Sequence, residues 1–550
     1  MAKVPRRSFL AQAGMAGLAV ASQPWLGRSI RAQGTSDTTR VAIDSSRRIA
    51  MLDRNLFGSF LEHLGRAIYT GIYEPGSRLA DSNGFRTDVA NQIRNLGVPI
   101  VRYPGGNFVS GYHWLDGVGP KNARPRVLDR AWNTLETNQF GTNEFITWCR
   151  LVGTEPLFGM NFGTGTAEMA AALLEYCNVD RGTKWSDLRR QHGYEQPHHV
   201  KYWCLGNEMD GPWQIGHMPA RDYGLKAVDA ARQMRVVDPN IKLIACGSSG
   251  PFMPTYLEWD RQVLEECYDE VDAISLHRYF GNLEETGGDS SKYLAMNLAM
   301  DRQIEEIIAV CDMVRGLKRS NKQLWLSFDE WNVWYRARSG DAVDGHGKEA
   351  PHLLEEVYNL EDALLVGGLL NSLVRHSDRV RLACLAQLVN VIAPIMTNEN
   401  GLLLQTIYYP YAWALQYARG YALSLAPEGP TYEVAALGRP IESRGRAMPG
   451  LGQVPYLDVV ATFDPSAKAA ALFVLNRDLE KQREVQIDWH DLTPAKVIIC
   501  QTMTGDDLKA VNTFEVPKRV VPQPLEPPKV GARMTLRVPA RSYTVLSLAL

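Results

Sequence analysis

The sequence predicts an α/β protein, a (β/α)8 TIM barrel with a C-terminal antiparallel β-sandwich domain. Across residues 53–400, buried-strand patterns alternate with amphipathic helix patterns, which is the order expected of a parallel barrel. Across residues 415–550, short alternating strands are separated by Pro, Gly and Asp turns, as in a sandwich. Residues 38–52 are also strand-like, and we expect them to join the sandwich.

The N-terminus carries an export pattern. Arg6 and Arg7 stand directly before Ser-Phe-Leu, and a mildly apolar stretch follows as far as Ala21. This pattern predicts a twin-arginine signal peptide over residues 1–32, and therefore a periplasmic or extracellular location. The apolar stretch is too short to span a bilayer as a permanent helix.

The net charge and the cysteine content limit which partners and cofactors the chain is expected to bind. The formal net charge is -2, and the five positive charges of residues 1–32 bring it to -7 once they are removed. This gives no electrostatic case for a nucleic acid or an anionic membrane. Eight cysteines occur without a CxxC pair, and we expect buried free thiols. No His/Asp cluster suggests a metal, and no cofactor is expected.

Eight segments read as barrel strands because they are apolar on both faces and end at polar or glycine residues. They are 55–63, 99–105, 155–163, 200–208, 241–247, 271–279, 324–331 and 382–389. The helices expected between them are 143–152, 166–177, 221–237, 256–268, 293–317 and 361–376. An open doubly wound sheet is the alternative, but no GxGxxG loop opens a helix.

Seven later segments read as sandwich strands. They are 431–437, 456–463, 470–475, 483–488, 496–501, 534–538 and 543–548.

Two carboxylates stand at strand ends that are far apart in the sequence. The run VKYWCLGNEMDGP places Asn207 and Glu208 after a buried strand, and QLWLSFDEWNVWY places Asp329 and Glu330 after another. Catalytic groups of barrels are carried at this end of the strands. Two such acids beside aromatic rings suit glycosidic bond cleavage, where one protonates the leaving oxygen and the other attacks or stabilises the sugar. Neighbours on a strand face opposite ways, so only one of Asp329 and Glu330 should enter the pocket.

Further polar residues follow other strands. A pocket collected from the whole ring would draw on Glu62, His63, Arg102, Asn107, Trp114, Asn161, His277, Arg278, Tyr279, Gln387 and Asn390.

The chain resembles an α-L-arabinofuranosidase of glycoside hydrolase family 51, in the clan of retaining barrel glycosidases. The stretches that carry the resemblance run in the family's order from residue 57 to 390. They are FGSFLEHLGRAIYTGIYEP, VRYPGGNFVSGYHW, ETNQFGTNEF, WCLGNEMDGPWQIGH, SLHRYF, SFDEWNVWY and LAQLVN.

The resemblance implies a role for each matching residue. Glu208 matches the general acid/base, Glu330 the nucleophile, and Asn207 the amide that contacts the sugar 2-hydroxyl. Asp329 is left as a structural partner. The residues that match the furanose pocket are Glu62, Asn107, Tyr279 and Gln387, with Trp132 on the leaving-group side.

The resemblance also implies the substrate: terminal α-L-arabinofuranosyl residues of arabinan, arabinoxylan or their oligosaccharides, removed by double displacement. Family members often form homo-oligomers, an expectation that no single residue here carries. A β-xylosidase or endoglucanase on the same scaffold, a non-catalytic carbohydrate-binding protein and a metal-dependent barrel hydrolase remain alternatives. A panel of aryl glycosides would identify a β-xylosidase or endoglucanase, and sensitivity to EDTA would identify a metal-dependent hydrolase. The presence of both acids disfavours a non-catalytic binding protein.

Overall fold

The computed structural model describes residues 37–337, 345–439 and 447–550. The predicted signal peptide, residues 1–32, lies outside the described residues. None of the helices in the described ranges has the length and apolar character needed to cross a membrane. All eight cysteines are buried free thiols, as predicted.

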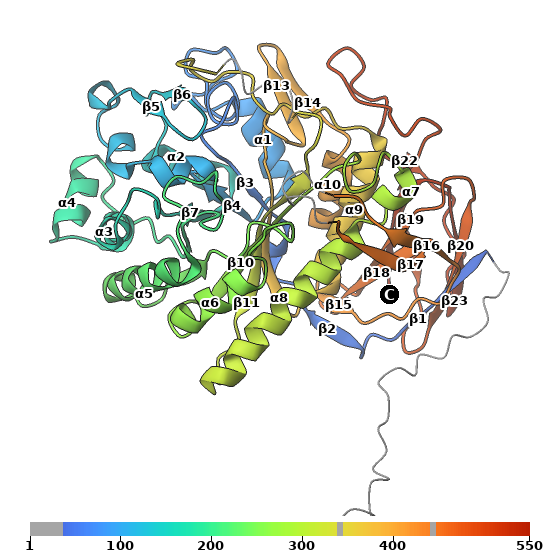
Figure 1. Cartoon of the computed structure of the whole chain (residues 1–550). Coiled ribbons are helices and arrows are strands. Elements are labelled where there is room, and N and C mark those ends of the chain that lie inside the picture. Colours follow the sequence, from blue (N-terminus) through green and yellow to red (C-terminus); the bar gives the residue numbers. More distant parts are fainter. Residues whose placement is uncertain (1–36, 338–344, 440–446) are drawn as a thin grey trace, which may run out of the picture. The chain divides into compact units, whose positions relative to one another are not determined.

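Eight parallel strands close into a barrel, which confirms the predicted fold class (Figure 1). Each strand pairs with the next in chain order, and β12 returns to pair with β3. The barrel strands are β3 (Gly58–Phe60), β4 (Ile100–Tyr103), β7 (Glu155–Gly159), β8 (Tyr202–Leu205), β9 (Lys242–Ala245), β10 (Ala273–Phe280), β11 (Trp325–Val333) and β12 (Val380–Leu385). All eight expected strand segments contain or overlap one of these strands.

Helices surround these strands in Figure 1. They are α1 (Thr87–Leu96), α2 (Thr142–Val152), α3 (Ala167–Asn178), α4 (Lys184–Gln191), α5 (Ala220–Val237), α6 (Glu258–Cys267), α7 (Ser290–Tyr293), α8 (Asn297–Lys318), α9 (Leu360–Arg375) and α10 (Tyr408–Tyr417). The sequence prediction lacks α1, whose apolar face of Val89, Ile93 and Leu96 is short and follows a polar, glycine-containing loop. Gly97 ends this helix in the left-handed conformation, with φ 72°.

A long loop region follows β4 and carries two of the predicted site residues, Asn107 and Trp132. It begins with the 3-10 helix η2 (Asn107–Gly111) and includes a hairpin of β5 (Val127–Asp129) and β6 (Thr134–Glu136). Trp132 lies in the turn of this hairpin, and the Asp129 carboxylate accepts from the Trp132 backbone N–H at 3.0 Å. At the base, Glu136 lies 2.8 Å from His63 Nδ1. The hairpin is therefore fixed to the end of strand β3.

The C-terminal part forms two antiparallel-rich sheets. The larger has the order β2-β15-β18-β19-β24-β21-β22 and the smaller β1-β20-β23. Strand β1 pairs in parallel with β20, and β2 pairs with β15, so the first described segment belongs to these sheets. Their bounds are β1 (Thr38–Ile43), β2 (Arg48–Met51), β15 (Tyr421–Leu423), β18 (Leu457–Asp464), β19 (Ala469–Asn476), β20 (Arg483–Trp489), β21 (Lys496–Met503), β22 (Gln523–Pro524), β23 (Arg533–Val538) and β24 (Ser542–Ala549).

The strand expected at 431–437 forms, but it does not join the sandwich sheets. Within the described residues, strand β16 (Thr431–Ala436) pairs with β17 (Pro449–Pro455) in a separate two-stranded sheet. Most of β16 is exposed or half-buried, so it lacks the apolar face that a sandwich strand must bury. A second hairpin, β13 (Ile395–Asn398) with β14 (Gly401–Leu404), follows the last barrel strand.

Helix α9 joins the barrel to the larger sheet. It packs against β18 and β19, and two glycines make the approach close. A Cβ on Gly367 would lie 2.6 Å from the Tyr543 ring, and one on Gly368 would lie 3.0 Å from Leu475. The Tyr543 hydroxyl donates to Asn371 Oδ1 at 3.0 Å. A larger residue at position 367 would therefore push the sheet away.

Buried charges cross the same junction. Asp458 on β18 forms an ion pair with Arg375 of α9, and the same guanidinium donates to Asp301 of α8 at 2.8 Å. Asp458 also accepts from Asn297 at 3.0 Å and lies 3.6 Å from Arg477. A charge in such a setting is tolerated only while it is paired.

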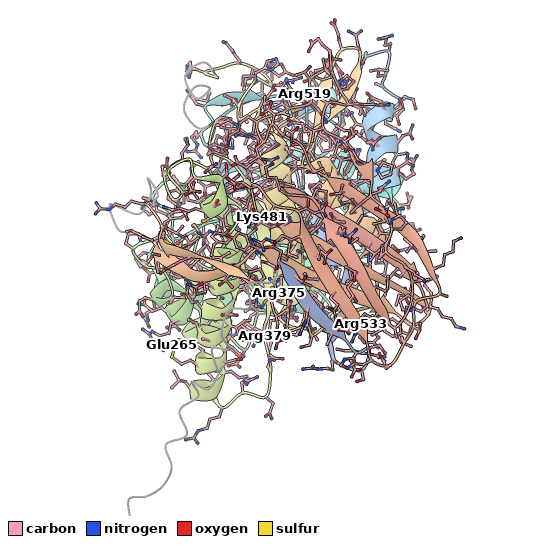
Figure 2. All side chains as sticks on the ribbon, turned by 90° about the vertical axis from the view of Figure 1, so that its right-hand side faces the viewer. Glu265, Arg375, Arg379, Lys481, Arg519 and Arg533 are labelled. Atoms are coloured by element: carbon pink, nitrogen blue, oxygen red, sulfur yellow. The ribbon has the colours of Figure 1, made fainter. Side chains whose placement is uncertain are left out.

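We therefore expect Arg375→Met to destabilise the protein by about 2–3 kcal/mol, because it leaves two nearly buried carboxylates short of a cation. Arg533→Met is the matched control: that side chain is 74% exposed and pairs with Asp488 on the surface, so its loss should cost about 1 kcal/mol or less. Both arginines are labelled in Figure 2. Thermal melting of the two variants measures the difference, and equal melting temperatures would contradict this account of the junction.

Candidate active site

The end of strand β8 places Asn207 and Glu208 in the mouth of the barrel. Gly206 adopts φ 103°, a conformation that favours glycine, and Glu208 itself has φ 45°. This turn directs the two side chains differently. Asn207 is buried and accepts from Arg102 at 2.6 Å, whereas the Glu208 side chain is 12% exposed. A non-glycine residue with positive φ is uncommon and marks functional sites.

Strand β11 presents Glu330 beside two donors. Arg102 of β4 donates to Glu330 Oε1 at 2.5 Å, and the Tyr279 hydroxyl of β10 donates to Oε2 at 2.9 Å. The Glu330 side chain is 6% exposed. Both oxygens therefore accept hydrogen bonds, which stabilises the charged carboxylate.

His277 of β10 connects the two glutamates to Asp329. Its Nδ1 lies 3.0 Å from Glu208 Oε1 and 3.7 Å from Glu330 Oε2, and its Nε2 lies 3.0 Å from Asp329 Oδ1. Burial alone would lower the pKa of His277, but the negative Glu330 and the hydrogen bonds to Asp329 and Glu208 raise it to about 10. His277 is therefore an imidazolium near neutral pH, and both ring nitrogens donate.

Asp329 and Glu330 do not separate as strict alternation predicts. Both contact Arg102 and His277: Asp329 lies 3.9 Å from Arg102 Nε and 3.0 Å from His277. The pairing of β11 with β12 is irregular between Phe328 and Trp331, and such bulges re-aim side chains. Asp329 is 1% exposed and also accepts from Cys204 at 3.3 Å, so it lies beneath the pocket as a partner of the cations.

The separation of Glu208 and Glu330 decides between two chemistries. Oxygens of the two carboxylates and a nitrogen of His277 all lie within 4.8 Å of one another. Retaining glycosidases hold their carboxyl groups about 5–5.5 Å apart, and inverting ones about 6.5–9.5 Å. The close spacing suits a direct attack by one carboxylate. The same trio has a spacing suited to a metal ion, which His277 could bind only after losing its proton.

Glu62 and the β5–β6 hairpin, which carries Trp132, form another part of the site. Its Oε1 accepts from the Phe108 backbone N–H at 2.8 Å and from Trp132 Nε1 at 2.9 Å. Its own backbone N–H donates to Gln387 Oε1 at 3.0 Å. Gly106 allows this packing, because a Cβ there would lie 2.5 Å from Glu62 Oε2. Three segments, around residues 106–108, 132 and 387, thus meet at Glu62.

Burial changes the protonation of Glu62. Loss of hydration raises its pKa to about 8, more than the hydrogen bonds from Phe108 and Trp132 lower it, and the charge of Glu330 adds to the rise. Glu62 is therefore a neutral carboxylic acid near pH 7, able to donate one hydrogen bond. Glu330 and Glu62 thus differ in charge because only Glu330 has cations beside it.

Contacts link Glu62 to Trp132 and Gln387, and Arg102 to Asn207 and Glu330. Other residues expected in the ring have different partners: Arg278 donates to the Ala299 carbonyl at 3.2 Å, Asn390 donates to the Arg66 carbonyl at 2.9 Å, and Trp114 packs against Trp185.

Tyr279 stands edge-on to Trp334, with ring centroids 5.2 Å apart. Asn107 begins η2 and is half-buried; its carbonyl oxygen lies 3.5 Å from Gln214 Nε2. The sequence prediction lacks Trp213, whose Nε1 donates to Glu208 Oε2 at 2.7 Å. Its place five residues after Glu208 was the available signal.

Two glutamates lie close together at the ends of strands β8 and β11 of a TIM barrel, and one of them, Glu330, accepts hydrogen bonds at both oxygens. This arrangement defines a glycoside hydrolase of the retaining type. Comparison with known proteins narrows this class. Residues 92–293 match the family described as "Alpha-L-arabinofuranosidase 1 domain", and residues 329–542 match "Alpha-L-arabinofuranosidase C-terminal domain".

Individual relatives agree with these matches. An intracellular exo-α-(1→5)-L-arabinofuranosidase of Halalkalibacterium halodurans is 46% identical, over 86% of this chain and 92% of the relative. An exo-α-(1→6)-L-arabinofuranosidase of Bifidobacterium longum is 42% identical, over 89% and 93%. The solved structure of a family 51 α-L-arabinofuranosidase from the same organism has 39% identity and a TM-score of 0.85, covering 93% of this chain and 99% of that one. The chain belongs to glycoside hydrolase family 51, the α-L-arabinofuranosidases.

The comparisons also correct the predicted location. Four relatives that are 44–46% identical are named intracellular enzymes, which contradicts a periplasmic or extracellular location reached by a twin-arginine signal. An arginine pair before a mildly apolar stretch is a short pattern with little information.

The raised pKa of Glu62 predicts a stability difference that depends on pH. A carboxyl group whose pKa is raised from 4.5 to about 8 on folding contributes most below pH 4.5, and that contribution is lost as the pH rises towards 8. Glu62→Gln keeps the acceptor oxygen and cannot ionise. The variant should therefore become more stable relative to the wild type as the pH rises from 5 to 8. The difference in the free energy of unfolding should grow by at most about 1.4 kcal/mol per pH unit, and the difference in melting temperature should grow with it.

A difference between the two melting curves that stays constant from pH 5 to pH 9 would contradict a neutral Glu62. Thermal melting in a series of buffers of equal ionic strength makes this measurement.

Proposed function

We propose that the protein removes non-reducing terminal α-L-arabinofuranosyl residues by double displacement, with Glu330 as nucleophile and Glu208 as general acid/base. The observation that carries the proposal is the pair of glutamates within 4.8 Å, one of which has both oxygens held by Arg102 and Tyr279. An arabinose-containing saccharide is the substrate class, as the names of the relatives indicate.

In the first step, a Glu330 oxygen attacks the anomeric carbon while the bond to the leaving oxygen breaks. The leaving oxygen takes the proton of Glu208. Arg102 and Tyr279 hold the attacking carboxylate in place, so little reorganisation is needed as its charge disappears. The product is an ester between the sugar and Glu330.

In the second step, Glu208 accepts a proton from water, the water oxygen attacks the anomeric carbon and the ester to Glu330 breaks. Glu330 regains its charge and the sugar keeps its configuration. His277, as an imidazolium, favours the charged form of Glu208 that this step requires.

The sugar pocket is assigned to Glu62, Asn107, Asn207, Tyr279 and Gln387, with Trp132 at its side. Arg102 donates to the side-chain oxygen of Asn207, and the amide nitrogen of Asn207 lies 3.4 Å from Gln214 Oε1. A neutral Glu62 offers a hydroxyl donor to a furanose oxygen, and the Trp132 indole fixes its orientation. These groups come from the ends of five different strands and from one hairpin, so they converge only in the closed barrel.

The linkage follows from the relatives. Those from 44% to 46% identical are named for α-(1→5) linkages, and the one that is 42% identical for α-(1→6) linkages. We therefore assign α-(1→5)-linked arabino-oligosaccharides as the preferred substrate. Because those relatives are named intracellular, short oligosaccharides are favoured over polymer. The enzyme of different specificity on this scaffold, a β-xylosidase or endoglucanase, has no support among these names.

The roles of the two glutamates are tested by leaving group and by azide. Glu330→Ala should lose activity with every leaving group, whereas Glu208→Ala should still be glycosylated by an aryl arabinofuranoside with an acidic phenol, because that group leaves without a proton. The glycosyl-enzyme should accumulate as a burst. Azide needs no base, so it should restore turnover in Glu208→Ala and give the azide of retained configuration.

In Glu330→Ala, azide would attack directly and give the inverted product. The opposite pairing of variant and stereochemistry would reverse the two assignments. An inverted sugar from the wild type in water would refute double displacement.

The linkage has its own assay. We expect kcat/KM for α-(1→5)-arabinobiose to exceed that for α-(1→6)-arabinobiose by about tenfold, equal to about 1.4 kcal/mol of differential transition-state binding. Aryl β-xyloside serves as the negative control. Equal values for the two disaccharides would refute the assigned linkage and leave the enzyme class intact.

A further inference from the structure

Both carboxylate oxygens of Glu208 accept hydrogen bonds from nitrogens. His277 Nδ1 lies 3.0 Å from Oε1, and Trp213 Nε1 lies 2.7 Å from Oε2. Two N–H donors, one on each oxygen, favour the charged form of a carboxyl group. The arrangement therefore suits Glu208 as a base, yet the first step requires it to hand a proton to the leaving oxygen.

The two donors differ in their freedom to move. His277 is 3% exposed and is held from its other side by Asp329. Trp213 is 41% exposed and lies on the loop after β8, between Gly211 and Gly216. Its indole lies over Gly211, where a Cβ would come within 2.5 Å of the ring. An exposed side chain of this kind changes rotamer within nanoseconds, so Oε2 is the oxygen that can be released.

We propose that Trp213 is a positioning residue that latches Glu208: its indole N–H occupies Oε2 in the free enzyme, and the arriving leaving-group sugar displaces it. Once the indole moves away, Oε2 is free to carry the proton to the glycosidic oxygen. The latch rests on the proposed role of Glu208 as general acid/base. It ties the proton-donating form of Glu208 to the presence of a substrate.

The latch makes the free enzyme and the substrate complex differ in pH dependence. A hydrogen bond to the charged form favours that form, so the alkaline limb of the pH–rate profile should lie at lower pH for the free enzyme than for the complex. The other ionisable groups facing Glu208 are His277, Tyr279, Glu330 and Asp210. They are the same in both states of the latch, so Trp213 can be tested alone.

Trp213→Phe keeps an aromatic ring and removes the N–H donor. With α-(1→5)-arabinobiose, kcat/KM reports the free enzyme, and the glycosylation rate at saturating substrate reports the complex. We expect the alkaline limb of kcat/KM to move to higher pH by about half a unit to one unit, the size expected for one hydrogen bond to a charged group near the surface. The alkaline limb of the saturated rate should stay where it is in the wild type.

Trp185→Phe is the matched control. Trp185 is half-buried on α4 and packs against Trp114, with ring centroids 5.5 Å apart; its substitution should move neither limb. Melting temperatures of both variants verify that they fold.

Three outcomes decide the proposal. If the limb of kcat/KM does not move in Trp213→Phe, the indole does not hold Glu208 in the free enzyme and the latch is refuted. If both limbs move equally, the indole stays bonded through the step and displacement is refuted. If the azide products reverse the roles of the two glutamates, the proposed function fails first, whatever Trp213→Phe does.

Discussion

The site depends on burying three carboxylates within a few ångströms, which is possible only because two cations are buried with them. Arg102 contacts Glu330, Asn207 and Asp329, and His277 contacts Glu208, Glu330 and Asp329. Removing either cation would leave these carboxylates with one cation instead of two, at a cost of several kcal/mol. The barrel supplies this balance because β4, β10 and β11 end at the same face.

The same balance divides the glutamates into different chemical states. Glu330 has both oxygens held by Arg102 and Tyr279 and is positioned as an anion. Glu62 is as deeply buried but has only neutral donors, so its pKa rises to about 8 and it is a neutral donor. Glu208, partly exposed, contacts one cation and one movable indole. Three residues of one type therefore take three different roles through their neighbours.

Much of the fold and part of the candidate site were predictable from the sequence. Each barrel strand is an apolar run that ends abruptly at polar residues, so both the fold class and the position of Glu208 and Glu330 follow from local pattern. The charge balance does not, because Arg102, His277 and Asp329 are distant in the sequence and their contacts exist only in the closed barrel. The orientation of Asp329 depends on an irregularity between β11 and β12. Strand β16 has a strand pattern but no apolar face, so local pattern misassigned its partner, and the arginine pair at the N-terminus was equally uninformative about location.

The central claim is that Glu330 is the anion that the cations hold for attack on the sugar. A 2-deoxy-2-fluoro-arabinofuranosyl fluoride should slow both steps and release the good leaving group, so the covalent intermediate accumulates. Proteolysis and mass spectrometry of the trapped enzyme then locate the label. The account predicts one arabinofuranosyl ester, on Glu330. A label on Glu208, Asp329 or Glu62, or none with full inactivation, would contradict it.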